Sequence, residues 1–156
     1  AHSEGIVLIH DAVRPFVRAA LMRSCLDGVR ATGACIPVLP ATETLKRVDE
    51  KGLVIGTLDR RRVCLAQTPQ TFAIDLIRRA HRLAGQRGFT ATDDASIAEF
   101  AAERVAVVPG DPENIKITTP QDLTIARAIR QNWNPQARRS PQSVGAIGQD
   151  AGDHSG

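Results

Sequence analysis

The alternation of short apolar runs with amphipathic stretches restricts this chain of 156 residues to a small set of folds. The apolar runs are too short for helices and predict strands, whereas the stretches between them repeat apolar residues every three or four positions. Strands that alternate with helices in this way are typical of an α/β sheet with a mostly parallel core. The predicted strands cover about 7–9, 34–39, 63–67, 104–108 and 114–118, and the predicted helices cover about 19–31, 73–84, 92–101 and 120–132.

One predicted strand ends directly before charged residues. The apolar run 7–9 is followed by Asp11 and Arg14, and Pro15 cannot donate a hydrogen bond to a sheet. Both charged side chains therefore follow the carboxyl end of a strand, which is where open α/β sheets bind ligands. A carboxylate there can hold Mg²⁺, and an arginine can clamp a phosphate through two hydrogen bonds. A solvated turn with an incidental ion pair is the alternative, and this stretch alone does not separate the two.

Residues 42–58 have a different pattern. Charged and apolar side chains alternate from Thr44 to Asp49, residues 50–52 are turn-like, and residues 53–55 resume an extended run, which together predict a β-hairpin. Because an isolated two-stranded hairpin is marginal in water, we expect this arm, at about 42–62, to pack on something else, such as a second subunit. The basic run at 60–62 is by itself typical of a solvated loop.

Composition and charge limit the partners. Hydrophobic residues make up 42% of the chain and aromatic residues only 3%, so the predicted core is aliphatic. No apolar run approaches the ~20 residues of a membrane span, and the first residues do not resemble a signal peptide, so we expect a cytoplasmic protein with no membrane partner. The net charge of +3 suits an anionic small molecule, and no aromatic-studded basic stretch indicates a nucleic acid.

Three further features are expected to be structural. The three cysteines lack metal-ligand spacing and indicate free, buried thiols. The paired acids Asp93 and Asp94 follow Thr92 at the start of a predicted helix, where Thr92 as N-cap and acids in the first turn explain them better than a metal does. Residues 134–156 lose all periodicity and are predicted to be a disordered tail behind a domain at 1–133.

Six motifs then occur in one order between Val7 and Arg130. They are HDAVRP at 10–15, TLK at 44–46, DR at 59–60, QTPQ at 67–70, TDDAS at 92–96 and NIKIT at 114–118. Together they closely resemble the 2-C-methyl-D-erythritol 4-phosphate cytidylyltransferase family of non-mevalonate isoprenoid synthesis. The resemblance implies a Rossmann-like nucleotidyltransferase sheet with an inserted β-hairpin dimerisation arm. It also implies transfer of a cytidylyl group from CTP to a sugar-alcohol phosphate, with release of diphosphate and with Mg²⁺ as cofactor.

The resemblance implies a catalytic group of three residues. Asp11 matches the family's aspartate at the metal and substrate-phosphate site, and Arg14 matches the arginine beside it. Lys116 matches the lysine that stabilises charge on the reacting phosphates. A lysine at a strand edge that faces water is the alternative for Lys116.

The resemblance also implies substrate contacts outside this group. Thr44 and Arg60 match arm residues that, in the family, reach the methylerythritol phosphate of the partner subunit, which implies a homodimer. Thr68 and Thr92 match further contacts to substrate hydroxyl or phosphate groups.

The beginning of the chain departs from the family pattern. The family opens with a strand and a Gly-rich loop whose Arg and Lys cradle the CTP phosphates, and nothing here matches them. We therefore expect the C-terminal part of a longer enzyme, truncated at its N-terminus and inactive in isolation. Two alternatives stay open, which are a sibling enzyme for another polyol phosphate such as ribitol 5-phosphate, and an inactive dimerisation or binding module. Glu43, where an aspartate is common, is a conservative departure.

Overall fold

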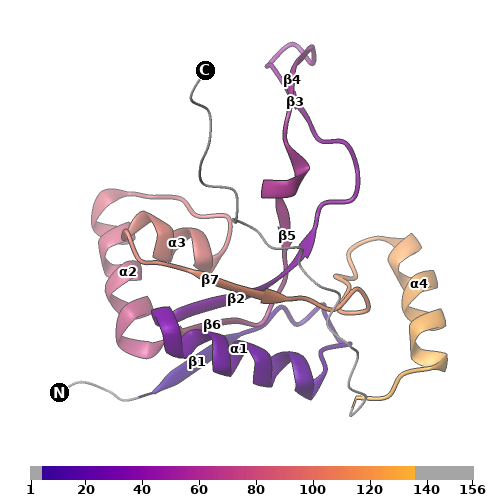
Figure 1. Cartoon of the computed structure of the whole chain (residues 1–156), viewed down its shortest axis with the longest axis horizontal. Helices are drawn as coiled ribbons and strands as arrows, with labels where there is room; N and C mark the ends of the chain where they lie inside the picture. The colour runs from indigo at the N-terminus through magenta and orange to yellow at the C-terminus, as the bar shows by residue number, and fades with distance from the viewer. Residues whose placement is uncertain (1–4, 136–156) are drawn as a thin grey trace, which may run out of the picture.

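Figure 1 shows the computed structural model of the chain, which describes residues 5–135. The helices are α1 (Ala19–Thr32), α2 (Ile74–Arg87), α3 (Asp94–Phe100) and α4 (Pro120–Gln131), as the sequence predicts. The strands are β1 (Ile6–Ile9), β2 (Ala34–Pro40), β3 (Lys46–Val48), β4 (Val54–Thr57), β5 (Cys64–Ala66), β6 (Gln70–Ala73) and β7 (Ala106–Pro109). A 3₁₀ turn, η1 (Arg60–Arg62), precedes β5. The short strand β6 was not predicted. Most of the predicted tail, 136–156, lies outside the described residues.

The strands of the central sheet run in two directions. β6 lies between β1 and β2 and is antiparallel to both. β5 pairs antiparallel with the end of β2, and β7 pairs in parallel with the opposite edge of β2. The α/β fold class is confirmed. The prediction of a mostly parallel sheet is wrong, because three of the four strand pairings in the described sheet are antiparallel. The arm is the reason, because it turns the chain back beside β2 without a crossover helix.

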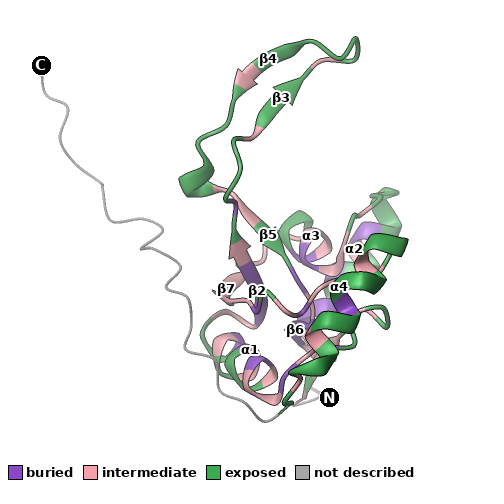
Figure 2. Ribbon diagram, turned by 90° about the vertical axis from the view of Figure 1, so that its right-hand side faces the viewer, coloured by how far each residue is buried: buried purple, intermediate pink, exposed green. Residues whose placement is uncertain are grey.

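Helices cover both faces of this sheet (Figure 2). Side chains of β2 alternate between the two layers, as a strand's period requires. Ala34 packs into a cluster with Phe72 of β6 and with residues of α2 and α3, whereas Cys35 faces α1, where a Cβ added to Gly28 would lie 2.5 Å from its Sγ. Cys25 and Cys35 are free and buried, as predicted, and the third cysteine is free but only partly buried.

Helix ends follow local sequence signals closely. Thr119 caps α4 by accepting a hydrogen bond from the Asp122 amide, with Pro120 in the first turn. In α3 the N-cap is Asp93 rather than the expected Thr92, because the Asp93 carboxylate accepts from the Ser96 amide, 2.9 Å away. None of the helices in the described part of the chain is long and apolar enough to cross a membrane.

The predicted hairpin is present and projects from the sheet (Figure 1). β3 and β4 pair with each other, and no other strand among the described residues pairs with either. Its apolar side chains are largely exposed, with Leu53 and Val54 each 63% exposed. The hairpin therefore buries little apolar surface within its own chain.

The loop at 110–118 replaces a strand that the sequence predicts at 114–118. The Asn114 amide donates to the Asp111 carbonyl within the loop, and the Ile117 amide donates to the Val13 carbonyl, each at 2.9 Å. A strand would need a continuous ladder, and these isolated bonds form a turn and a bridge instead. This stretch is therefore held to the loop after β1 by a backbone hydrogen bond and does not join the sheet.

A buried arginine anchors this loop. Arg18, just before α1, is 4% exposed and contacts the carboxylates of Asp111 and Glu113, each at 2.5 Å. Its guanidinium also lies over the Trp133 ring, 4.2 Å from the centroid, and Trp133 packs edge-on against Phe16. The start of α1, the loop at 110–118 and the end of α4 are thereby held together.

Candidate active site

The carboxyl ends of β1 and β7 meet at one edge of the sheet, because both strands run in the same direction as β2 between them. Asp11 follows β1, and Lys116 lies in the loop after β7. The Lys116 Nζ lies 3.4 Å from Asp11 Oδ2. The structure therefore brings together two charged residues that are distant in sequence, as the sequence predicts.

Arg14 completes the charged cluster. Its Nε donates to Asp11 Oδ2 at 3.2 Å, and its Nη1 donates to the Asn114 carbonyl at 2.7 Å. The Arg14 side chain is only 12% exposed, whereas that of Lys116 is 50% exposed. The guanidinium is thus fixed by two partners, while the ammonium keeps freedom to move toward a ligand.

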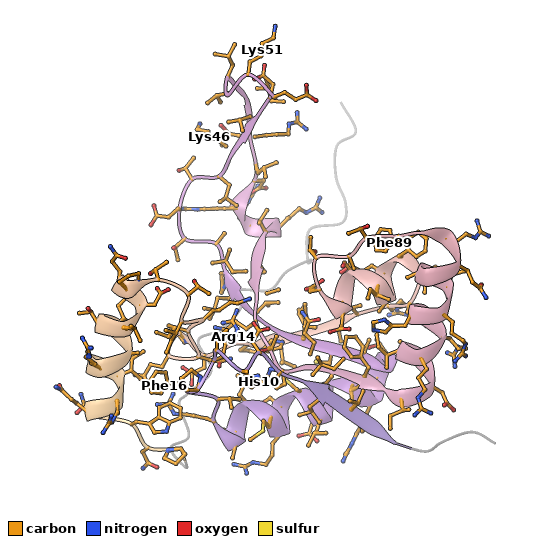
Figure 3. All side chains as sticks on the ribbon, turned by 180° about the vertical axis from the view of Figure 1, so that it is seen from behind. His10, Arg14, Phe16, Lys46, Lys51 and Phe89 are labelled. Atoms are coloured by element: carbon orange, nitrogen blue, oxygen red, sulfur yellow. The ribbon has the colours of Figure 1, made fainter. Side chains whose placement is uncertain are left out.

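Thr68, which the family resemblance places outside the catalytic group, also lies in this cluster. Its Oγ1 accepts a hydrogen bond from the Asp11 amide at 3.0 Å and lies 2.9 Å from the Nδ1 of His10. The other ring nitrogen of His10 lies 2.9 Å from the Arg14 carbonyl, to which it can only donate. His10 and Arg14 are labelled side by side in Figure 3. His10 belongs to the HDAVRP motif, and its bridging position depends on a residue 58 positions away in sequence.

Electrostatics keep Asp11 ionised. Partial burial alone would raise the pKa of Asp11, but hydrogen bonds and positive charge from Arg14 and Lys116 outweigh it, so the pKa of this carboxyl lies below its ordinary value. Two cations facing one carboxylate leave a net positive charge at the sheet edge. A site of this kind favours an anionic ligand such as a phosphate.

Thr92 reaches the same part of the sheet indirectly. It precedes Asp93, whose carboxylate accepts a hydrogen bond from Gln70 Nε2 at 2.7 Å. Gln70 begins β6, two positions after Thr68. No hydrogen bond or ion pair joins Thr92 to Asp11, Arg14 or Lys116 in the described structure, and its side chain is exposed.

The two arm residues stay apart from the cluster. Thr44 and Arg60 are exposed near the base of the arm, where Arg60 Nη1 donates to the Thr42 carbonyl at 2.6 Å. Within residues 5–135 no hydrogen bond or ion pair connects either of them to Asp11, Arg14 or Lys116. The basic run η1 is solvated, with Asp59 and Arg61 paired at 2.8 Å.

Asp11 can supply one ligand to a magnesium ion. Mg²⁺ in phosphate-transfer sites is held by one or two carboxylates together with water and substrate phosphates. The described residues contain no group of three or more His, Cys, Asp or Glu side chains that could enclose a metal. The residues present therefore fit an ion that is bound mostly by its substrate, and they do not fit a permanent metal centre.

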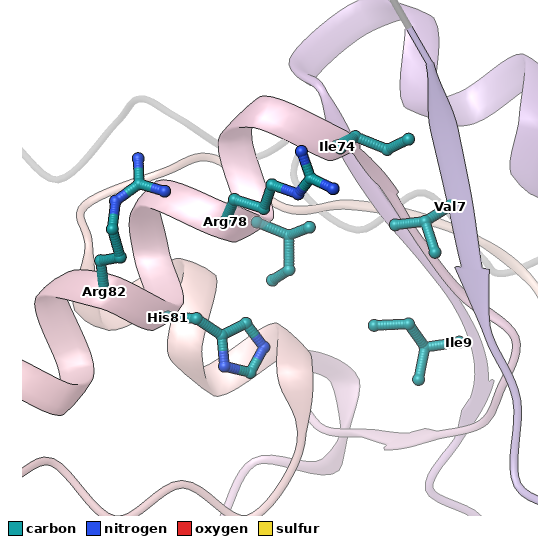
Figure 4. Close-up of a pocket in the computed structure, with 7 residues that line it drawn as sticks. Val7, Ile9, Ile74, Arg78, His81 and Arg82 are labelled. Atoms are coloured by element: carbon teal, nitrogen blue, oxygen red, sulfur yellow. The ribbon is translucent and has the colours of Figure 1, made fainter. Parts of the chain in front are cut away.

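A second concave region lies on another part of the sheet (Figure 4). A cavity of about 560 Å³ opens between β1 and α2, and its lining is mostly apolar. The lining residues are Val7, Ile9, Ile74, Ile77, Arg78, His81 and Arg82. None of the predicted site residues lines it, so this cavity is separate from the charged cluster around Asp11.

These features define a class, an α/β protein with a cationic, phosphate-suited site at the carboxyl edge of its sheet. Residues 1–132 match the model of the family described as IspD, 2-C-methyl-D-erythritol 4-phosphate cytidylyltransferase. The chain belongs to this family.

Individual relatives agree with this assignment. A protein of Geotalea uraniireducens with the family's name is 45% identical over 133 residues, which are 85% of this chain and 57% of the relative. A Bradyrhizobium protein named bifunctional enzyme IspD/IspF is 49% identical over 123 residues, 78% of this chain and 31% of the relative. The crystal structure of the family's enzyme from Thermus thermophilus superposes with a TM-score of 0.73 at 38% identity, covering 81% of this chain and 62% of that one. The chain thus spans little more than half the length of the single-function relative.

Proposed function

We propose that this chain forms part of a cytidylyltransferase that transfers a cytidylyl group from CTP to 2-C-methyl-D-erythritol 4-phosphate and releases diphosphate. Family membership over residues 1–132 supports this activity. The single observation that carries it is the convergence of Asp11, Arg14, Lys116 and Thr68 at one edge of the sheet. An enzyme of this pathway is expected in the cytoplasm.

The charges of the cluster suit the chemistry. Attack of one phosphate on another brings two anions together, so catalysis depends on positioning and on neutralising the charge that accumulates. Arg14 is held in place and would orient the acceptor phosphate, whereas the half-exposed Lys116 would leave Asp11 and contact the reacting phosphates. Thr68, next to Asp11, would donate a hydrogen bond to the same ligand once its hydroxyl turns from His10.

Asp11 would also hold Mg²⁺. Its lowered pKa keeps the carboxylate ionised, which is the form that binds a hard cation. Held by Asp11, Mg²⁺ would supply positive charge that offsets the negative charge of the phosphates. Because one carboxylate is a weak metal site, binding of the ion should depend on the nucleotide.

The arm would complete the site of a second copy. Thr44 and Arg60 have no ion pair with the cluster in the described part of their own chain, and the hairpin exposes a row of apolar side chains. A homodimer in which each arm packs against its partner would cover these side chains and carry Thr44 and Arg60 to the partner's acceptor phosphate. The marginal stability of an isolated hairpin supports this arrangement.

An assay that compares two acceptors tests the proposed activity. The longest gene product that contains these 156 residues is incubated with CTP, Mg²⁺ and either 2-C-methyl-D-erythritol 4-phosphate or ribitol 5-phosphate, and diphosphate release is measured. We expect release with the methylerythritol phosphate to exceed release with the ribitol phosphate. The reverse preference would indicate the sibling enzyme, and no release from a folded protein with either acceptor would indicate a binding module.

A further inference from the structure

Two buried glutamines flank Thr68 and Pro69 on the stretch between β5 and β6. Gln67 and Gln70 are 5% and 3% exposed, so neither can contact a substrate over much of its surface. Each uses both the oxygen and the nitrogen of its side-chain amide to bind a different loop. Buried amides that are fully engaged in this way hold backbone segments in one arrangement.

Gln67 binds the loop that carries Lys116. Its Oε1 accepts from the Asp111 amide at 3.0 Å, and its Nε2 donates to the Asp111 carbonyl at 2.9 Å and to the Asn114 carbonyl at 3.3 Å. The same Asn114 carbonyl accepts from Arg14. Lys116 follows two positions later, so Gln67 fixes the backbone from which Lys116 reaches Asp11.

The neighbourhood of Gln67 is closely fitted. A Cβ added to Gly110 would lie 2.5 Å from Gln67 Oε1, so the amide can approach the loop only because position 110 lacks a side chain. Asn114 strengthens the same junction, since its Nδ2 donates to the Thr68 carbonyl at 2.7 Å. The loop after β7 is therefore joined to residues 67 and 68 by side chains from each segment, Gln67 from one and Asn114 from the other.

Gln70 binds the loop that carries Thr92. Its Nε2 donates to the Asp93 carboxylate at 2.7 Å, and its Oε1 accepts from the Ala95 amide at 2.8 Å. Asp93 is the N-cap of α3, so this contact sets where the helix begins. Thr92 lies one position before Asp93, so Gln70 holds the loop that carries it.

We propose that Gln67 and Gln70 are positioning residues that divide the site between them, Gln67 fixing the loop from which Lys116 reaches Asp11 and Gln70 fixing the loop that carries Thr92. This inference rests on the proposed function, because it takes Lys116 as a contact to the reacting phosphates, and it takes Thr92 as the substrate contact that the family resemblance implies. It follows that loss of Gln67 affects turnover, whereas loss of Gln70 affects acceptor affinity.

The test uses Gln67→Met and Gln70→Met in the longest gene product that contains the chain. Methionine keeps the length of the side chain and removes its donor and acceptor. We expect Gln67→Met to lower kcat about 100-fold with a nearly unchanged KM for the acceptor, since small displacements of a reacting group have effects of this size. Gln70→Met should raise the acceptor KM about tenfold and leave kcat nearly unchanged, as expected for a weakened binding contact. Gln86→Met, at an exposed position on α2, is the matched control and should change neither.

Hydrogen–deuterium exchange of the same variants gives a readout that does not need activity. Gln67→Met should raise exchange in 110–116 and not in 92–96, and Gln70→Met should do the reverse. If a methionine variant does not fold, Gln67→Asn or Gln70→Asn replaces it, because asparagine keeps a neutral amide but is one methylene too short to reach the same partners. The same pattern is expected from these variants.

The outcomes separate the two proposals. Local exchange changes in a protein that never releases diphosphate would support the positioning of the two loops and contradict the proposed function. An active parent whose variants shift kcat and KM together, or whose exchange rises throughout the sheet, would overturn the division between Gln67 and Gln70. Variants identical to Gln86→Met in every measurement would overturn it as well.

Discussion

The sheet edge around Asp11 and the arm both carry clustered charge, but they hold it differently. At the edge, Arg14 is 12% exposed and binds a carbonyl 100 positions away in sequence. In the arm, Arg61 is 86% exposed and binds Asp59, two positions away. The edge is therefore shaped by contacts between distant segments, whereas this part of the arm is shaped only by its neighbours in sequence.

This difference indicates different requirements for function. A site that must stabilise charge in a transition state benefits from groups that are already in place, because they need not reorganise during the reaction. The edge meets this condition within one chain. The arm does not, since its apolar side chains are exposed and its hairpin packs on no other strand of the described sheet. We therefore expect mutations at the edge to affect folding and chemistry, and mutations in the arm to affect assembly.

The largest effect is expected from Arg18→Ala. Removing the guanidinium leaves the buried Asp111 without its cation, and breaking one side of a buried ion pair costs about 3–5 kcal/mol of unfolding free energy. The matched control is Arg79→Ala, whose pair with Glu103 is exposed and should contribute at most about 1 kcal/mol. Chemical denaturation of both variants measures the difference. Equal losses of unfolding free energy in the two variants would mean that the buried ion pairs of Arg18 stabilise the fold no more than an exposed pair does.

The next effect concerns chemistry rather than folding. Lys116→Ala should lower kcat by about 10²–10³, equivalent to about 2.7–4 kcal/mol, the scale for one electrostatic donor. Because the Lys116 side chain is half-exposed, the unfolding free energy should change by no more than about 0.5 kcal/mol. Arg23→Ala, which removes a charge from the exposed surface of α1, is the control for net charge. Near-normal turnover of Lys116→Ala in an otherwise active protein would show that Lys116 does not stabilise the reacting phosphates.

A smaller effect separates two of the carboxylates whose pKa values are lowered, Asp11 and Asp59. Asp11 is held by Arg14 and Lys116 at the edge, and the pKa of the exposed Asp59 is lowered to about 2, chiefly by its side-chain hydrogen bond with Arg61. Salt screens exposed pairs more strongly than partly buried ones. Raising the salt concentration should therefore raise the pKa of Asp59 more than that of Asp11, as measured by NMR titration of the carboxyl carbons.

The lowered pKa of Asp11 also fixes the sign of the change in stability with pH. A carboxyl with a lower pKa in the folded state stabilises the fold above its unfolded pKa and loses this contribution as the pH falls through the folded value. Wild type should therefore lose more unfolding free energy than Asp11→Asn between about pH 5 and pH 1. Equal losses would show that Asp11 gains nothing from its two cations.

The sequence predicted those parts of the molecule that depend on local patterns. The four helices and the hairpin follow from apolar periodicity and from turn residues. The convergence of Asp11, Arg14 and Lys116 was also expected, because the family motifs and the end of β1 place them at one edge.

Parts that depend on long-range pairing were missed. A run of apolar residues does not reveal strand direction, so the antiparallel course of β5 and β6 beside β2 was not expected. The stretch 114–118 alternates like a strand, but its bonds go to Asp111 and Val13 and not to a neighbouring strand. Likewise, the roles of His10 and Gln67 depend on partners 58 and 44 positions away, which no local pattern identifies.

The smallest effect on folding is expected in the arm, where it distinguishes assembly from stability. Val54→Ser at a position 63% exposed should change the unfolding free energy of the monomer by no more than about 0.5 kcal/mol. The same change should weaken the dimer, because it adds a polar group to an apolar surface that the partner would bury. Sedimentation velocity measures the dimer fraction of Val54→Ser and of a comparison variant, Leu123→Ser. Leu123 is an exposed apolar residue on α4, outside the arm. A dimer that persists in Val54→Ser but dissociates in Leu123→Ser would move the interface to α4, and Thr44 and Arg60 would then lack a route to a second site.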